Sequence, residues 1–518
     1  MPENLSLGEI QNFKGKYPKQ LWYLFFSEMW ERFCFYGMRG MLTYFMVTQL
    51  FMKDVDANLQ YGATQAFVYA FTFIGGLFAD KILGFRKSLF WGGILMIAGS
   101  AILAYDPHQF FFLGISFTVV GTGFFKPNIS TMVGKLYKSD DARRDAGFSV
   151  FYAGINIGAL LGGYACITIG KQYSWHLAFG LAAIVMTISL ITFLFTQKSM
   201  GPIGLPPGQN EDVNDIAVSG IDDKVQTEPA VITVKSANRK WYDYAVYAGS
   251  LAIIPVIMIM VAKTQYTDWF MSVIGPVTLL YLIYEMSKYG WAERKKLLAA
   301  LVFILFSIVF WGIYEQSGGS LALFAARNLD NQALGGLLTL DPNGVNNSAN
   351  SLFVIIFAFI FSIIWIAMAK KKIEPNTVIK FGLAFIFLAG AFFVFYSTRF
   401  FANAEGIASL DVFAIAYLVM TFGELCLSPI GLSIMTKLSP VKLQGVMMGM
   451  WFLASAYGQY VAGLLGAGMA EAGEHDTPVQ KLISYTEGYK QLAIYSLIAG
   501  VILIVISPIV RKLMQEVK

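Results

Sequence analysis

Apolar runs of 18 or more residues recur along the whole chain, and they restrict the possible folds more than any other feature of the sequence. A run of this length is long enough to cross the hydrocarbon core of a bilayer as a helix. Only 14% of the residues are charged, against about 25% in soluble globular domains. Within lipid the backbone has to satisfy its own hydrogen bonds, which a helix does within one segment. The sequence therefore predicts an all-α polytopic membrane protein.

The apolar runs predict fourteen spans, arranged as six, two and six. They are expected at 21–50, 62–83, 88–105, 109–136, 147–170, 176–196, 243–262, 269–287, 297–325, 351–369, 376–398, 407–436, 443–469 and 485–510. The resulting domains are an N-terminal six-helix bundle (1–197), a polar linker (198–240), two extra helices (241–290) and a C-terminal six-helix bundle (291–518). Paired six-helix halves with polar residues near the midplane are typical of transporters that rock between two states.

The basic residues indicate the orientation of the chain. Lys and Arg gather in alternate loops, among them 81–87, 143–144 and 370–372. Cytoplasmic loops carry such an excess, so we expect both termini and the linker in the cytoplasm. Because the net charge of +5 comes from these loops, it does not indicate binding to nucleic acid.

The first span contains the segment SEMWERFCFYGMRG, residues 27–40, with four charged side chains. Each charge near the bilayer centre costs about 2.5–3.5 kcal/mol on insertion scales. Helical spacing places Glu28, Arg32, Tyr36 and Arg39 on one face, with Glu31 beside it. Two interpretations remain open: an ion pair that locks the helix, or a polar face turned toward a wet interior.

Charged residues in other spans favour the wet interior. Lys126 lies in the fourth span, and Glu315 and Glu424 lie in the second half. Buried ion pairs stabilise poorly compared with apolar packing, so this many of them indicates a functional cavity. The first half contributes the cations and the second half contributes Glu315 and Glu424, which suits a zwitterion lying between them. Other polar residues in the spans could line this cavity or form hydrogen bonds between helices. They are Tyr69, Asn156, Asn350 and Ser428.

The sequence offers little for other sources of energy or for catalysis. It has no G-x-x-x-x-G-K-[ST] phosphate loop, because MVGKLY continues with Leu after Gly-Lys. It also has no metal-ligand cluster and no nucleophile–base pair, so we expect no cofactor and no enzyme activity. None of the three histidines is expected at the centre of a span. Proton coupling would therefore use carboxylates whose proton affinity depends on nearby Arg or Lys.

Five motifs in order resemble the proton-dependent oligopeptide transporter family of the major facilitator superfamily. The first is Glu28-x-x-Glu31-Arg32-Phe33 followed by Tyr36-Gly37-Met38-Arg39. The others are GGLFADKILGFRK (75–87), RRDAGFSVFYAGINIGA (143–159), FWGIYEQSG (310–318) and GELCLSPIGLS (423–433). The pair of extra helices is similar to that of bacterial members. One departure is Phe35, where many members have a second tyrosine.

The resemblance implies a major facilitator fold and a symporter that imports di- and tripeptides with protons by alternating access, in a bacterial inner membrane. It implies a proton-coupling network of Glu28, Glu31, Arg32 and Lys126, with Glu315 as a partner of Lys126 in one conformation. Arg32 and Lys126, with Arg39 nearby, would receive the peptide carboxylate. Glu424 would hold the peptide amine, aided by Asn156 and Asn350. The side-chain pockets would be shaped by Tyr36, Tyr69, Trp311, Ser428 and Trp451.

Two alternatives remain. A related carrier of another zwitterion or anion, such as an amino acid or nitrate, would share the fold, although a nitrate carrier could dispense with the glutamates of the first span. A membrane sensor or enzyme would need a soluble module, which the 43-residue linker (198–240) and the short tails do not provide. We expect peptide, protons and the lipid bilayer as partners, and no obligate protein partner.

Overall fold

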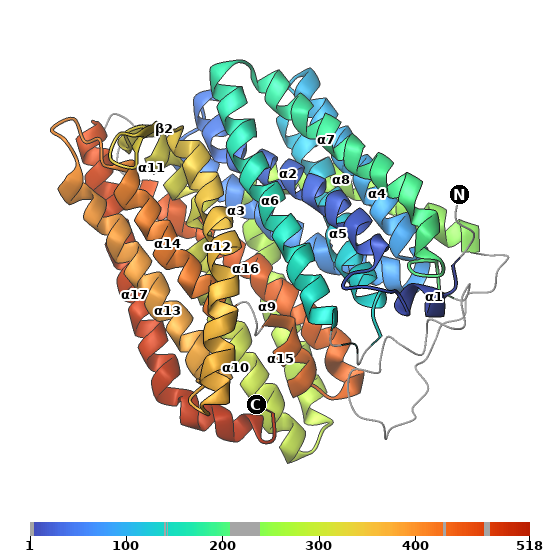
Figure 1. Cartoon of the computed structure of the whole chain (residues 1–518). Helices are drawn as coiled ribbons and strands as arrows, with labels where there is room; N and C mark the ends of the chain where they lie inside the picture. Colours follow the sequence, from blue (N-terminus) through green and yellow to red (C-terminus); the bar gives the residue numbers. More distant parts are fainter. Residues whose placement is uncertain are drawn as a thin grey trace. The chain divides into compact units, whose positions relative to one another are not determined.

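The computed structural model describes residues 5–138, 141, 143–207, 239–427, 431–470 and 477–517. Ser428 and most of the predicted linker lie outside these residues. Within them nearly all regular structure is helical (Figure 1). The strands are β1 (Gln332–Ala333) and β2 (Leu338–Thr339), which pair antiparallel with Gln332 opposite Thr339.

The helices follow one another along the chain. In the first part they are α1 (Leu7–Gln11), α2 (Lys19–Thr48), α3 (Asp54–Phe78), α4 (Phe85–Tyr105), α5 (Phe111–Lys135), α6 (Arg143–Gln172), α7 (Trp175–Thr196), α8 (Arg239–Ala262) and α9 (Thr264–Ser287). The remaining helices are α10 (Trp291–Tyr314), α11 (Ser320–Asn328), α12 (Pro342–Lys370), α13 (Thr377–Ser397), α14 (Leu410–Leu427), α15 (Gly431–Leu438), α16 (Gln444–Ala470) and α17 (Pro478–Met514). Short turns of 3-10 or π type lie at Ala79–Leu83, Gln197–Met200, Glu315–Gly318, Thr398–Phe401 and Val441–Leu443.

The long helices overlap the predicted spans, and two of the predicted spans are interrupted. Eleven helical segments of the described residues are long and apolar enough to cross a membrane. The helices α2, α5 and α16 are not among them, but they have 30, 25 and 27 residues. At 1.5 Å per residue each exceeds the hydrocarbon thickness of about 30 Å. The predicted fold class is confirmed.

The predicted span 297–325 is interrupted in the structure. The helix α10 ends at Tyr314, a 3-10 turn covers Glu315–Gly318, and α11 begins at Ser320. Gly318 and Gly319 explain the break, because glycine is a poor helix former in a helix interior. Similarly, the predicted span 407–436 contains two helices, α14 and α15, and residues 428–430 lie outside the described part.

The contacts divide the chain into two compact units. Unit 1 contains Met1–Met38, Phe67–Gly162 and Ile169–Ile259, and unit 2 contains Arg39–Ala66, Gly163–Thr168 and Met260–Lys518. The units follow contacts, whereas the predicted domains follow chain order. The domain boundaries therefore stay a prediction, and each unit is described by itself.

In unit 1, glycines let α4 and α5 approach each other closely. A Cβ added at Gly92 would lie 2.6 Å from the carbonyl oxygen of Gly121, and one at Gly99 would lie 2.5 Å from that of Gly114. These glycines are seven residues apart on each helix, so one face of each helix carries them. Small residues at such spacing bring helix backbones together in membranes.

The loop between α3 and α4 is also anchored within unit 1. Gly84 has φ +77°, a left-handed conformation that glycine adopts readily. Arg86 donates from Nε to the carbonyl of Ile203 at 2.7 Å and from Nη2 to the carbonyl of Gly201. The motif GGLFADKILGFRK thus ties this loop to the segment after α7.

The core of unit 2 is rich in aromatic rings. Phe395 of α13 contacts Phe413 and Tyr417 of α14 and Tyr489 of α17, with ring centroids 5.1–5.9 Å apart. These ring contacts join the three helices, and large aromatic rings bury much apolar area.

Candidate functional site

The charged face of α2 forms a buried cluster in unit 1. Arg32 Nε lies 3.2 Å from Oε1 of Glu28 and pairs more closely with Oε2 of Glu31. All three residues are at most 2% exposed. The guanidinium also lies over the ring of Phe35, 5.1 Å from its centroid. The structure therefore brings together the three charges predicted from the first motif.

Glycines of α6 allow α2 to sit this way. A Cβ at Gly158 would clash with the carbonyl oxygen of Met29 and lie 3.0 Å from Cβ of Arg32. One turn later, Gly162 faces the carbonyl of Phe33 in the same manner. The fifth-span motif thus places α6 directly against the charged part of α2.

Several polar atoms of this cluster have no hydrogen-bond partner among the described residues. They are Glu28 Oε2, Glu31 Oε1 and Arg32 Nη2. An unsatisfied buried polar group costs about 1–3 kcal/mol, and more when it is charged. A carboxylate of the cluster can therefore take up a proton or accept a further hydrogen bond, and the guanidinium can donate to a further acceptor.

Lys126 of α5 belongs to the same unit. Its Nζ lies 4.7 Å from the ring centroid of Tyr69 on α3. The Lys126 charge acts on both Glu28 and Glu31. Two carboxylates and two cations balance, so adding one substrate carboxylate would leave an excess negative charge unless a proton is also taken up.

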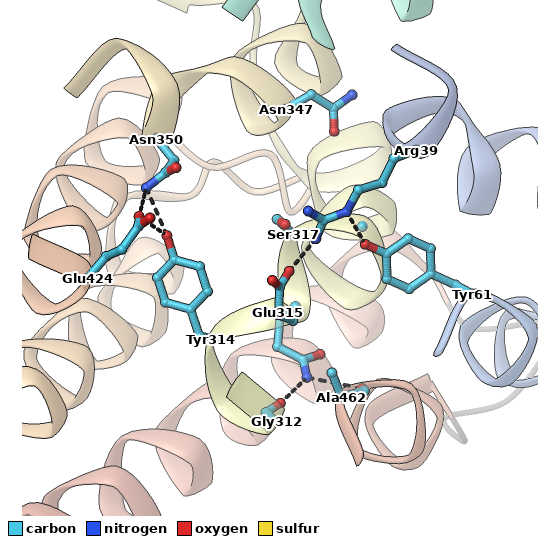
Figure 2. A network of polar contacts seen from close by, with 12 residues as sticks. Arg39, Tyr61, Gly312, Tyr314, Glu315, Ser317, Asn347, Asn350, Glu424 and Ala462 are labelled. Carbon is cyan, nitrogen blue, oxygen red and sulfur yellow. Dashed lines mark hydrogen bonds and ion pairs between the residues drawn. The ribbon is translucent and has the colours of Figure 1, made fainter. Parts of the chain in front are cut away.

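A second cluster lies in unit 2 around Glu424 of α14 (Figure 2). Its Oε2 accepts hydrogen bonds from Tyr314 Oη at 2.5 Å and from Asn350 Nδ2 at 2.8 Å. Asn350 Nδ2 also lies 3.1 Å from Thr421 Oγ1, one turn before Glu424. Among the described residues, no Lys or Arg is within ion-pair distance of the Glu424 carboxylate. The carboxylate is held by neutral donors.

A third cluster lies at the break between α10 and α11 (Figure 2). Arg39 forms a buried ion pair with Glu315 and donates from Nε to Tyr61 Oη at 2.7 Å. The hydroxyl of Thr43 donates to the carbonyl of Gly318. Lys126 belongs to unit 1 and Glu315 to unit 2, so their predicted pairing stays a prediction.

The other predicted site residues have structural contacts of their own. Asn156 is buried and donates to the carbonyl of Tyr152 in its own helix, at 2.9 Å. The ring of Tyr36 contacts Phe35, and Trp311 contacts Tyr314 edge to face, both with centroids 5.3 Å apart. Trp451 is buried in the core of unit 2. None of these contacts tests a role in binding.

Two tyrosines in the clusters were not predicted from the sequence. Tyr314 precedes Glu315 in the motif FWGIYEQSG, and Tyr61 lies eight residues before Tyr69 on α3. For Tyr314 the sequence did contain a signal, because it precedes the intramembrane Glu315 and a buried tyrosine usually finds a hydrogen-bond partner. In the described part of the chain, no group of three or more His, Cys, Asp or Glu side chains is arranged to hold a metal ion.

Comparison with protein families and curated proteins gives consistent matches. The family described as the POT family matches residues 86–481. The peptide transporter YePEPT of Yersinia enterocolitica is 35% identical over 467 residues, covering 87% of this chain and 88% of its own. A di-/tripeptide transporter of Lactococcus lactis is 31% identical over 535 residues, covering all of both chains. The uncharacterised transporter YclF of Bacillus subtilis is 33% identical over 513 residues, covering 97% of this chain and 96% of its own.

Solved structures agree over almost the entire length. A crystal structure of a peptide transporter POT in complex with sulfate has a TM-score of 0.78 and 30% identity, covering 99% of this chain and 100% of its own. A mutant of a POT peptide transporter in complex with alafosfalin matches with the same TM-score, identity and coverage.

Proposed function

The chain belongs to the POT family and is a membrane transporter, not an enzyme, and we propose that it imports di- and tripeptides together with protons. Its relatives are named peptide or di-/tripeptide transporters. Transport would proceed by alternating access of the two six-helix halves, as the family resemblance implies. The protein would reside in a bacterial inner membrane. Both termini would lie in the cytoplasm, an orientation that the distribution of Lys and Arg supports.

The observation that carries the proposal is the environment of Glu424. Its carboxylate accepts hydrogen bonds from Tyr314 and Asn350, and no cation of the described residues neutralises it. A buried or half-buried carboxylate without a cation is costly unless a positive group arrives. The ammonium group of a peptide supplies this charge, so Glu424 would be the amine site.

The opposite end of the peptide requires cations, which unit 1 provides. Arg32 has a guanidinium nitrogen, Nη2, without an acceptor in the part of the chain that the structure describes, and Lys126 lies near the same carboxylates. Both would receive the peptide carboxylate. Tyr36, Tyr69, Asn156, Trp311, Ser428 and Trp451 would line the peptide side chains, with Arg39 and Asn350 contributing further polar contacts.

Charge balance links the peptide to a proton. A peptide carboxylate adds one negative charge to a cluster in which Glu28 and Glu31 already balance Arg32 and Lys126. Protonation of one glutamate restores neutrality, and Glu31 is the better candidate since it is completely buried. Glu315 would act in the same network by exchanging its partner between Arg39 and Lys126.

Uptake of labelled dialanine into proteoliposomes tests the proposal. We expect accumulation against the peptide gradient when the proton gradient is directed inward. Glu31→Gln, which carries no titratable carboxyl, should retain counterflow exchange but lose proton-driven accumulation. If uptake by the wild type is the same with and without the proton gradient, proton coupling is contradicted. If dialanine is not transported at all, the substrate is another zwitterion or an anion.

A further inference from the structure

Tyr314 occupies the last residue of α10, where the span breaks. It is buried, and its hydroxyl donates to Oε2 of Glu424 at 2.5 Å (Figure 2). The ring stacks on Phe310 with centroids 5.6 Å apart and contacts Trp311. The ring is therefore held by packing, and the position of the hydroxyl oxygen is held with it.

Both donors of the Glu424 carboxylate reach the same oxygen. Asn350 Nδ2 lies 2.8 Å from Oε2, 2.8 Å from Tyr314 Oη and 3.1 Å from Thr421 Oγ1. An amide nitrogen has only two hydrogens, so these three acceptors cannot all be fully satisfied by Asn350. The Tyr314 hydroxyl supplies a hydrogen bond to Oε2 that does not depend on how Asn350 shares its hydrogens, and among the described residues no donor occupies Oε1.

We propose that Tyr314 is a positioning residue that holds the Glu424 carboxylate so that Oε1 faces the substrate ammonium. The inference rests on the proposed role of Glu424 as the amine site. A glutamate side chain has several rotatable bonds, and ordering it before the substrate arrives lowers the entropy lost on binding. Tyr314 thereby contributes to substrate affinity without touching the substrate.

The position of Tyr314 also places it next to the residue that pairs with Arg39. The next residue, Glu315, pairs with Arg39, so adjacent residues of one backbone turn hold the amine-site carboxylate and a buried cation. A phenylalanine at position 314 would leave the ring packing in place and remove only the hydroxyl. The substitution Tyr314→Phe is therefore a narrow test of the hydrogen bond.

The experiment measures uptake kinetics for dialanine in the wild type, Tyr314→Phe, Glu424→Gln and the double variant. Losing a hydrogen bond to a charged group lowers affinity about tenfold or more. We expect Tyr314→Phe to raise KM for dialanine about tenfold, with little change in maximal rate. In the Glu424→Gln background, Tyr314→Phe should change KM no further, because its partner carboxylate is already gone.

A matched control removes a similar hydroxyl from α14, the helix that carries Glu424. Tyr417 of α14 donates to Asn346 Oδ1 of α12 at 2.7 Å and joins these helices without contacting Glu424. We expect Tyr417→Phe to lower thermal stability but to leave KM unchanged. N-acetyl-dialanine, which lacks the ammonium, should bind Tyr314→Phe and the wild type equally.

The outcomes separate the inference from the proposed function. If Glu424→Gln raises KM and folded Tyr314→Phe behaves as the wild type, the inference is wrong and the amine site stands. If the two substitutions act additively, or N-acetyl-dialanine is affected as much as dialanine, Tyr314 acts elsewhere and the inference is also wrong. If Glu424→Gln itself leaves KM unchanged, the amine site is wrong and the inference fails with it.

Discussion

Charged residues inside the spans could be identified from the sequence, but their partners could not. Arg39 shares one helical face with Arg32, yet it pairs with Glu315, which is 276 positions away. Helical periodicity relates residues a few positions apart and says nothing about contacts between distant helices. The pairing of Glu28 with Arg32 was predictable for the opposite reason, since these residues are four apart on α2.

The Arg39–Glu315 pair provides a prediction at the scale of single residues. Both side chains are buried, at 9% and 5% exposure. Removing one partner of a buried pair leaves an uncompensated charge and costs about 3–5 kcal/mol. We expect Glu315→Gln to lower the free energy of unfolding by about this amount, measured as thermal unfolding in detergent. Arg39→Gln combined with Glu315→Gln should be less destabilised than Glu315→Gln alone.

The pair of Lys288 and Glu285 at the end of α9, which has one exposed partner, serves as the control for this effect. Lys288 is 46% exposed and Glu285 is 14% exposed, and the two side chains pair at 2.7 Å. Such surface pairs contribute about 0–1 kcal/mol, so Glu285→Gln should unfold nearly as the wild type does. Equal effects of Glu285→Gln and Glu315→Gln would show that burial does not govern the Arg39–Glu315 pair.

At the scale of helices, length and hydropathy predicted most elements, whereas the close packing of individual helices was not predictable. The apolar runs are helical over most of their length because the bilayer leaves few alternatives. The break after Tyr314 was missed, since the run 297–325 remains apolar across it. The close packing of the α6 glycines on α2 was also not predicted, because a sequence motif does not show which helix it packs against.

Gly158 provides the prediction at this scale. A methyl group there would meet the Met29 carbonyl, a backbone atom that cannot rotate away. The helices α2 and α6 would have to separate, and such overpacking costs about 1–3 kcal/mol. We expect Gly158→Ala to unfold at a lower temperature and to transport less dialanine. Gly249 of α8 has no atom within 4 Å of an added Cβ, so Gly249→Ala should be neutral or slightly stabilising through helix propensity. A wild-type-like Gly158→Ala would contradict the close packing of α2 on α6.

For the whole molecule, the order of the long helices along the chain was predictable from the apolar runs, but the two contact units were not. The helices α2, α3 and α6 each contribute residues to both units. A division by chain order places a whole helix in one bundle, whereas the two ends of one helix can pack against different sets of residues. The placement of the extra helices likewise depends on contacts that no periodicity encodes.

Polar pairs are among the contacts of the helices α8 and α9 with the rest of the protein. On α8, Asp243 pairs with Lys87 at 2.5 Å, and Ser250 accepts a hydrogen bond from Trp91 at 2.9 Å. On α9, Asp268 accepts a hydrogen bond from Tyr460 of α16 at 2.6 Å. The proposed binding and coupling residues all lie on other elements. The sequence of the extra helices has few polar residues, with Lys263, Asp268 and Glu285 at or near the ends of the spans, and it therefore predicts that these helices pack outside the transport path.

Removing residues 241–290 tests that prediction. An even number of spans is lost, so the orientation of the C-terminal half should be preserved. We expect the shortened protein to unfold at a lower temperature, because the contacts of α4 and α16 are lost, yet to accumulate dialanine when the proton gradient is directed inward. The same deletion combined with Glu31→Gln should abolish that accumulation, which would show that the remaining uptake uses the α2 network. A shortened protein that folds but transports no peptide would instead place the extra helices within the transport cycle, where neither their composition nor their contacts puts them.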